Sequence, residues 1–236
     1  YNYETFDQIA DNDEIDIVYV VLPNAMHHEY TLRAAAAGKH VICEKPMAVS
    51  VQECEEMVRA CREAGVKLSI GYRLHFDPFN LEMMRLGQEQ VHGAVKLVEA
   101  GFGFRAMGFK NWRFDHEMAG GGALMDVGIY CIQGGCYTLG EKPVSVATTE
   151  VKTYEKFAEV DETLAWHMEF PSGALASCTT SYAIGINRLF AAAEEGRFEL
   201  EPAYTYGPLK GWVNWEAMGF EQVNQQAAQM DGFALH

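Results

Sequence analysis

Short apolar runs alternate with helical patterns over the first 72 residues of the chain. The runs predict three strands, at residues 15–22, 39–43 and 66–70. The segments between them predict two helices, at residues 25–37 and 50–64, each followed by a glycine suited to ending a helix. The first run is apolar almost without interruption, as in a parallel sheet that is buried on both faces. This order of elements predicts an incomplete doubly wound, Rossmann-like parallel sheet.

The pattern changes after residue 73. A short helix at 78–86 and a long strand at 94–104 come first, and a helix at 123–139 follows a run of three glycines. Alternating apolar and polar positions then predict five strands, at residues 144–152, 163–170, 174–181, 189–193 and 197–201. We therefore expect two domains, at residues 1–72 and 73–236. The second would be an α+β substrate domain with a mostly antiparallel open sheet.

Composition narrows the classes of function. Eighteen basic and 33 acidic residues give a net charge of −15, without the clustered Lys and Arg that nucleic acid binding requires. No apolar run approaches the ~18 residues of a membrane span. The six cysteines lack CxxC spacing and are expected to be reduced and mostly buried. The eight histidines lack HxxxH spacing, so we expect no metal site.

The tripeptide Glu44-Lys45-Pro46 directly follows a predicted buried strand. In open parallel sheets, ligands bind beyond the carboxyl ends of the strands. A lysine placed there can donate to a substrate hydroxyl and lower the pKa of a neighbouring acid. The same three residues recur at Glu141-Lys142-Pro143 after a predicted helix, where a solvated turn is expected. The motif alone therefore leaves Lys45 open between a functional and a structural role.

A second candidate is the segment 120–130, which begins with three successive glycines. Asp126 and Tyr130 are four residues apart and would share one face of a helix. The glycines would permit a ligand to approach the backbone closely at the start of that helix. The alternative is an exposed aspartate followed by an ordinary core tyrosine. Weaker candidates, which could simply be polar surface or domain-contact residues, are His27, His28, Trp112 and Arg113.

Three motifs, taken together and in order, resemble the Gfo/Idh/MocA oxidoreductase family. They are LPNAMHHEYTLRAAAAGKHVICEKPM at 22–47, GYRLHF at 71–76 and GGGALMDVGIY at 120–130. Within the family the chain is most similar to the glucose–fructose oxidoreductase branch, because Tyr130 stands where many other members have histidine. The segments FELEPAY at 198–204 and NQQAAQMDGFA at 224–234 also resemble that branch.

The resemblance implies roles for particular side chains. Lys45 would bridge the nicotinamide ribose and the sugar hydroxyl, Tyr130 would exchange the proton of the reacting hydroxyl, and Asp126 would help to hold the sugar. The cofactor would be lined by Pro23, Asn24, His27, Glu44, Lys45 and Arg113. A tyrosine, with an ordinary pKa of about 10, becomes a better base beside an ammonium group, which favours its phenolate.

The resemblance also implies an activity. The protein would be an oxidoreductase that uses NADP(H), or NAD(H), to oxidise a pyranose at C1 to the lactone, with the hydride then returned to a ketose. One alternative is an NAD(P)-dependent sugar or inositol dehydrogenase whose cofactor exchanges at each turnover. The other is a truncated binding or assembly module that catalyses nothing.

The chain departs from the family in one respect. No GxGxxG motif precedes a predicted strand, although this motif holds the pyrophosphate of a dinucleotide. We therefore expect the glycine-rich half of the cofactor domain, and the end of the substrate domain, to lie outside this sequence. The compartment, cytoplasmic or periplasmic, is left open.

The second predicted sheet also bears on assembly. Its strands carry many apolar side chains, among them Trp166, Met168, Phe170 and Leu175. A single layer of helices would not cover all of them, and large exposed apolar areas usually mark interfaces. Together with the resemblance, this predicts a homodimer or homotetramer formed through the C-terminal sheet.

Overall fold

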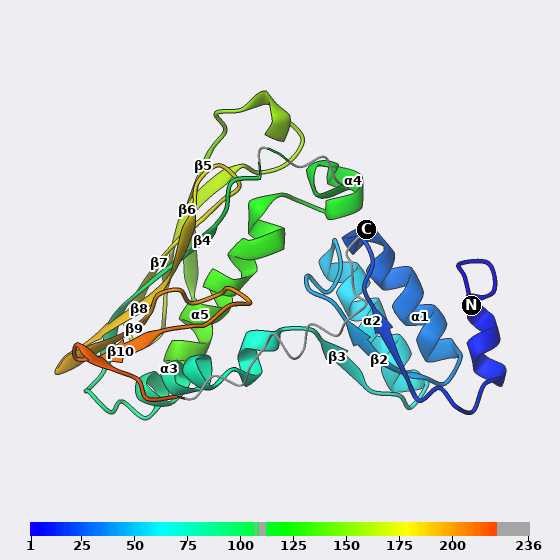
Figure 1. Ribbon diagram of the computed structural model, residues 1–236, viewed down its shortest axis with the longest axis horizontal. Helices are drawn as coiled ribbons and strands as arrows, with labels where there is room; N and C mark the ends of the chain where they lie inside the picture. Colours follow the sequence, from blue (N-terminus) through cyan, green and yellow to red (C-terminus); the bar gives the residue numbers. More distant parts are fainter. Residues whose placement is uncertain (107, 109–111, 221–236) are drawn as a thin grey trace. The chain divides into compact units, whose positions relative to one another are not determined.

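The computed structural model describes residues 1–106, 108 and 112–220 (Figure 1). The chain divides into two compact units at residue 73, where the sequence analysis also places a boundary. The first unit contains residues 1–72 together with 112–126 and 154–161, and the second contains the remaining described residues. The segments 112–126 and 154–161 therefore pack with the first unit, although the sequence analysis assigned them to the second domain. The predicted segment 224–234 lies outside the described residues.

The first unit is built on a three-stranded parallel sheet in the order β1-β2-β3. Its strands are β1 (Ile17–Val20), β2 (His40–Cys43) and β3 (Leu68–Ile70). Its helices are η1 (Phe6–Asp11), η2 (Asn24–Met26), α1 (His27–Ala36), α2 (Val51–Glu63), η4 (Trp112–Phe114), α4 (His116–Ala119) and η6 (Glu155–Phe157). The Ser50 hydroxyl accepts from the Glu53 amide at 3.2 Å and caps α2, as the sequence predicts. This part of the predicted Rossmann-like sheet is confirmed.

One face of this sheet is exposed. Helices α1 and α2 pack together, and side chains such as Val41 and Cys43 are buried with them in one apolar core. The alternate side chains of β1 point the other way, and Ile17 and Tyr19 are 53% and 52% exposed. The expectation of a strand buried on both faces is therefore wrong for β1, because the helices of the described residues cover a single face.

The second unit contains an eight-stranded sheet in the order β11-β10-β9-β8-β4-β7-β6-β5. All its neighbouring strands are antiparallel except β4 and β7. The strands are β4 (Val95–Gly103), β5 (Ser145–Val151), β6 (Thr163–Glu169), β7 (Leu175–Ser181), β8 (Ile186–Ala193), β9 (Gly196–Leu200), β10 (Gly211–Val213) and β11 (Glu216–Ala217). Its helices are η3 (Arg73–Phe76), α3 (Pro78–Gln88) and α5 (Ile129–Leu139). The π-helical segment η5 (Leu124–Gly128) precedes α5, and its residues 124–126 belong to the first unit. The predicted mostly antiparallel sheet is confirmed.

Three of the four apolar side chains singled out in this sheet are covered within the unit, whereas Leu175 is partly exposed. Trp166, Met168 and Phe170 are buried, and a Cβ added at Gly135 of α5 would lie 3.0 Å from Met168 and 3.9 Å from Phe170. The expectation that these three side chains overflow a single helix layer is therefore wrong. They alternate with exposed positions along β6, so they all point to the face that α5 covers. Assembly through this sheet stays a prediction that rests on the family resemblance.

The close approach of α3 and α5 provides a test of the packing in the second unit. A Cβ added at buried Gly87 would lie 2.0 Å from the backbone oxygen of Thr138, an overlap that only a shift of one helix could relieve. We expect Gly87→Ala to lower the free energy of unfolding by about 1–3 kcal/mol, measured by urea titration. Gly185→Ala is the matched control, because no atom lies within 4 Å of the added Cβ there. Equal stability of the two variants would contradict this packing.

Candidate active site

The ends of β1 and β2 bring two predicted cofactor segments to the same edge of the first unit, because the strands are parallel. Pro23 and Asn24 follow β1, and Glu44 and Lys45 follow β2. The Asn24 amide is buried and donates to the backbone oxygen of Ala119 at 2.8 Å. The Glu44 carboxylate accepts from the Tyr19 hydroxyl and from the Lys45 amide. The loops that should line a cofactor are thus held by contacts within the unit.

His27 lies between these two loops. Its ring nitrogens are 2.8 Å from the Pro46 oxygen and 2.9 Å from the Leu22 oxygen, and the residue is 1% exposed. Both contacts are hydrogen bonds only when both nitrogens carry a proton. The reading of His27 as polar surface is therefore wrong, because it connects the two strand ends from inside. His28, by contrast, forms a partly exposed pair with Glu56 at 2.8 Å.

The central feature of the first unit is an ion pair between Lys45 and Asp126. The Lys45 ammonium lies 3.1 Å from Asp126 Oδ1 and 2.5 Å from the backbone oxygen of the same residue. Only 13% and 14% of the two side chains are exposed, and Arg113 Nε lies 3.5 Å from the other carboxylate oxygen. Removing one partner from such a largely buried pair typically costs about 3–5 kcal/mol. Three residues nominated from distant parts of the sequence are therefore brought together.

Asp126 stands in a π-helical segment rather than in a regular α-helix. Residues 124–128 are π-helical, and α5 begins at Ile129. The prediction of one continuous helix from 123 to 139 is therefore wrong in its first turn. Short π-helical segments are rare and occur frequently at functional sites.

Tyr130 belongs to the second unit. Its ring packs 5.7 Å from that of Phe102 and 6.1 Å from that of Tyr204, centroid to centroid. Burial raises the pKa of the Tyr204 hydroxyl well above its ordinary value, so Tyr204 stays protonated and is not an alternative base. The approach of Tyr130 to Lys45 stays a prediction, because the two residues belong to different units.

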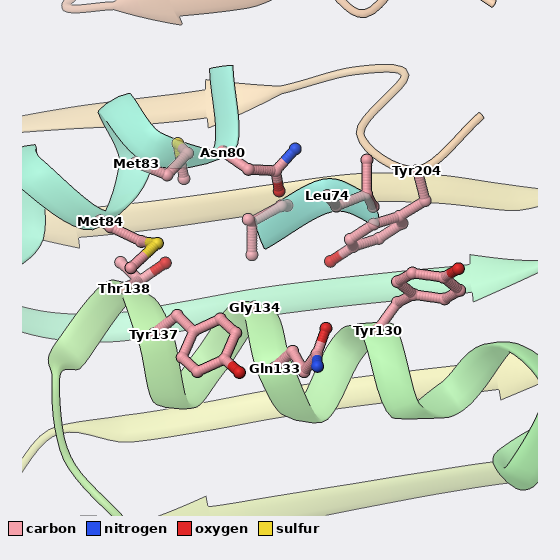
Figure 2. A pocket seen from close by; sticks show the side chains of 11 residues that line it. Leu74, Asn80, Met83, Met84, Tyr130, Gln133, Gly134, Tyr137, Thr138 and Tyr204 are labelled. Atoms are coloured by element: carbon pink, nitrogen blue, oxygen red, sulfur yellow. The ribbon is translucent and has the colours of Figure 1, made fainter. Parts of the chain in front are cut away.

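A small cavity lies between α3 and α5 beside Tyr130 (Figure 2). Its volume of about 20 Å³ accommodates one water molecule and is too small for a sugar ring. It is lined by Leu74, Asn80, Met83, Met84, Tyr130, Gln133, Gly134, Tyr137, Thr138, Leu189 and Tyr204. The cavity borders Tyr130 and is lined mainly by side chains of α3 and α5.

The three glycines at 120–122 are in close contact with other parts of the protein itself. Gly120 ends α4 in the left-handed conformation, with φ of 72°. A Cβ at Gly122 would lie 2.0 Å from the backbone oxygen of Asp161. The expected close approach of a ligand is thus replaced, at Gly122, by the approach of a second chain segment. Sequence reasoning missed Asp161, because an acidic residue before a predicted strand carries no motif.

The remaining sequence-based expectations concern cysteines, metals and membranes. All six cysteines are free and none is exposed, and burial raises the pKa of Cys43 and Cys178 to about 12. Within the part of the chain that the structure describes, no cluster of three or more His, Cys, Asp or Glu side chains could hold a metal ion. No helix among the described residues combines the length and the apolar character needed to cross a bilayer.

The strand ends fit one half of a nicotinamide dinucleotide. Lys45 supplies a charged donor beyond β2, next to the cofactor segments at 23–24 and 44. None of the described residues forms a GxGxxG turn between a strand and a helix, which a pyrophosphate requires. The charge and donors at these strand ends are compatible with a nicotinamide ribose, whose contact with them stays a prediction, and the pyrophosphate cradle is not among the described residues.

Comparison with known proteins agrees with this fold and site. A model of an oxidoreductase family with an NAD-binding Rossmann fold matches residues 1–72, and a GFO/IDH/MocA C-terminal domain model matches residues 81–200. A D-xylose 1-dehydrogenase (NADP(+)) of Haloarcula marismortui is 33% identical over 98% of this chain and 68% of its own length. A trans-1,2-dihydrobenzene-1,2-diol dehydrogenase of Danio rerio is 35% identical over 90% of this chain and 62% of its own.

Among solved structures, an aldose–aldose oxidoreductase from Caulobacter crescentus, complexed with glycerol, superposes with a TM-score of 0.90. It is 41% identical, and the match covers 98% of this chain and 71% of that one. The Rossmann-like sheet and the mostly antiparallel open second sheet are those of an NAD(P)-dependent oxidoreductase family. The chain belongs to the Gfo/Idh/MocA oxidoreductase family. It spans between 62% and 71% of the length of these three relatives.

Proposed function

We propose that the complete protein oxidises a pyranose at C1 with NADP(H), or NAD(H), and returns the hydride to a second sugar, a ketose or an aldose. The observation that carries this proposal is the Lys45–Asp126 pair beyond the end of β2. An ammonium held there can donate to a sugar hydroxyl and to the nicotinamide ribose. The similarity to an aldose–aldose oxidoreductase over 98% of the chain supports the use of two sugars.

Each half-reaction divides the work between cofactor and protein. When bound, the cofactor accepts a hydride from C1 and later releases it. As the C1–H bond breaks, Tyr130 takes the proton of the C1 hydroxyl and the carbonyl of the lactone forms. In the return step the carbonyl carbon of the second sugar would gain that hydride while Tyr130 gives its proton to the carbonyl oxygen, so that a hydroxyl forms and Tyr130 is again ready to accept a proton. Lys45 orients the hydroxyl, and Asp126 holds Lys45 and the sugar.

An exchangeable-cofactor dehydrogenase is the second candidate, favoured by the similarity to D-xylose 1-dehydrogenase (NADP(+)). The absorbance of the purified complete protein at the reduced-nicotinamide band separates the two. We expect retained cofactor whose band rises with an aldose and falls again with a second sugar. Cofactor-free protein that reduces added NAD(P) would support the dehydrogenase instead. Protein that neither retains nor reduces the cofactor would overturn both and leave the non-catalytic module.

A further inference from the structure

The Asp161 carboxylate lies at the start of the segment that carries Asp126. Its Oδ1 accepts from the Gly122 amide at 2.6 Å, and its Oδ2 accepts from the Leu124 amide at 2.7 Å. The Asp161 backbone oxygen also accepts from the Ala123 amide at 3.1 Å. Three successive amides that have no partner within the first turn of a helix are thus satisfied by one residue. Two of these bonds are charge-assisted and therefore strong.

This arrangement is specific to the local sequence. The added Cβ at Gly122 would overlap the Asp161 backbone at 2.0 Å, so the contact requires glycine at that position. Gly122 in turn accepts from the Asp126 amide at 3.1 Å, which connects the held turn to the residue that binds Lys45. A continuous series of short contacts therefore runs from Asp161 through the glycine turn to Asp126 and its ion pair with Lys45.

We infer that Asp161 is a positioning residue, which sets the place of Asp126, and through it of the Lys45 ammonium, by holding the turn at residues 122–124. The inference rests on the proposed function, because it assigns Asp161 to the same site. The Asp161 carboxylate supplies acceptors at the start of the segment, where the first amides of a helix have no carbonyl one turn earlier to bond to.

Asp161→Asn in the complete protein is the direct test. The amide keeps one acceptor oxygen but turns an NH2 donor toward the other backbone amide, which leaves that amide without a partner. We expect kcat/KM for the aldose to fall by about 10- to 100-fold, the scale of a small misplacement of reacting groups. Hydrogen exchange of the amides of residues 122–124 should accelerate. Glu159→Gln, at an exposed acidic residue two positions earlier, is the control and should stay within twofold.

A double-mutant cycle with Asp126→Asn distinguishes positioning from a general structural role. If Asp161 acts through Asp126, Asp161→Asn should add little to the loss already caused by Asp126→Asn. Full additivity, or unchanged kcat/KM in folded Asp161→Asn, would overturn the inference. If Asp161→Asn unfolds, Asp161→Glu takes its place, and hydrogen exchange of residues 122–124 is measured in that variant. Unchanged exchange together with unchanged kcat/KM in Asp161→Glu would overturn the inference as well. Absence of activity in the unmodified complete protein would refute the proposed function, whereas the exchange measurement would still test Asp161.

Discussion

Turnover should fall by about 10²–10⁴-fold in Tyr130→Phe, while the affinity for the sugar stays within a few-fold of the unmodified protein. The substitution removes only the hydroxyl that would exchange the proton, and general acid–base catalysis contributes on this scale. The ring would keep its packing against Phe102 and Tyr204, so the fold should persist. Steady-state kinetics of the complete protein with both sugars, followed by formation of the lactone, gives kcat and KM separately.

Tyr137→Phe is the matched control for this experiment. Tyr137 is also on α5 and lines the same cavity, seven residues further along the helix (Figure 2). Its hydroxyl has no role in the proposed chemistry, so turnover should stay within about threefold. A Tyr130→Phe enzyme that also stays within threefold would remove Tyr130 from proton transfer.

The second large effect is expected at Lys45. Lys45→Ala should weaken the binding of both cofactor and sugar and lower kcat/KM by at least about 10²-fold, because a charged donor to both is lost. Lys142→Ala should change neither affinity, since Lys142 is exposed after α5 although it stands in the same Glu-Lys-Pro tripeptide. Cofactor titration and sugar kinetics on both variants of the complete protein provide the comparison.

The stability of Lys45→Ala must be measured together with its kinetics, because Asp126 loses the ammonium partner that lies 3.1 Å away. Thermal unfolding identifies any Lys45→Ala preparation that is not folded at the assay temperature. Equal kinetic effects of the two substitutions in folded proteins would show that the strand end carries no special function.

Local sequence predicted the elements of the first unit well. The capped helix at Ser50 and the apolar strands at 15–22, 39–43 and 66–70 depend on interactions between residues close in the chain, which periodicity and capping reveal. Periodicity could not show that the sheet has one exposed face. Which side of an apolar strand is covered depends on where the helices pack, and Tyr19 looks the same in the sequence whether covered or exposed.

The nomination of site residues depended on motifs, and their arrangement depended on the fold. Glu-Lys-Pro occurs twice, and among the described residues the lysine of the copy after β2 pairs with an aspartate 81 residues further along the chain. The sequence leaves His27 open between polar surface and a cofactor-lining role, because no sequence pattern shows that two strand-end carbonyls face its ring. The role of the glycines at 120–122 was taken to be ligand access, whereas Gly122 makes room for Asp161.

The sequence by itself thus determined the fold class, the family resemblance and the identity of Lys45, Asp126 and Tyr130 as candidates. These properties follow from the spacing of apolar residues and from short motifs, both of which can be seen in stretches of neighbouring residues. Only the tertiary structure decided which partners meet: the Lys45–Asp126 ion pair and the Asp161 bonds to the glycine turn. Such contacts join segments 81 and 39 residues apart. They arise because folding of the whole unit brings these segments together, and no local pattern of apolar and polar residues specifies that meeting.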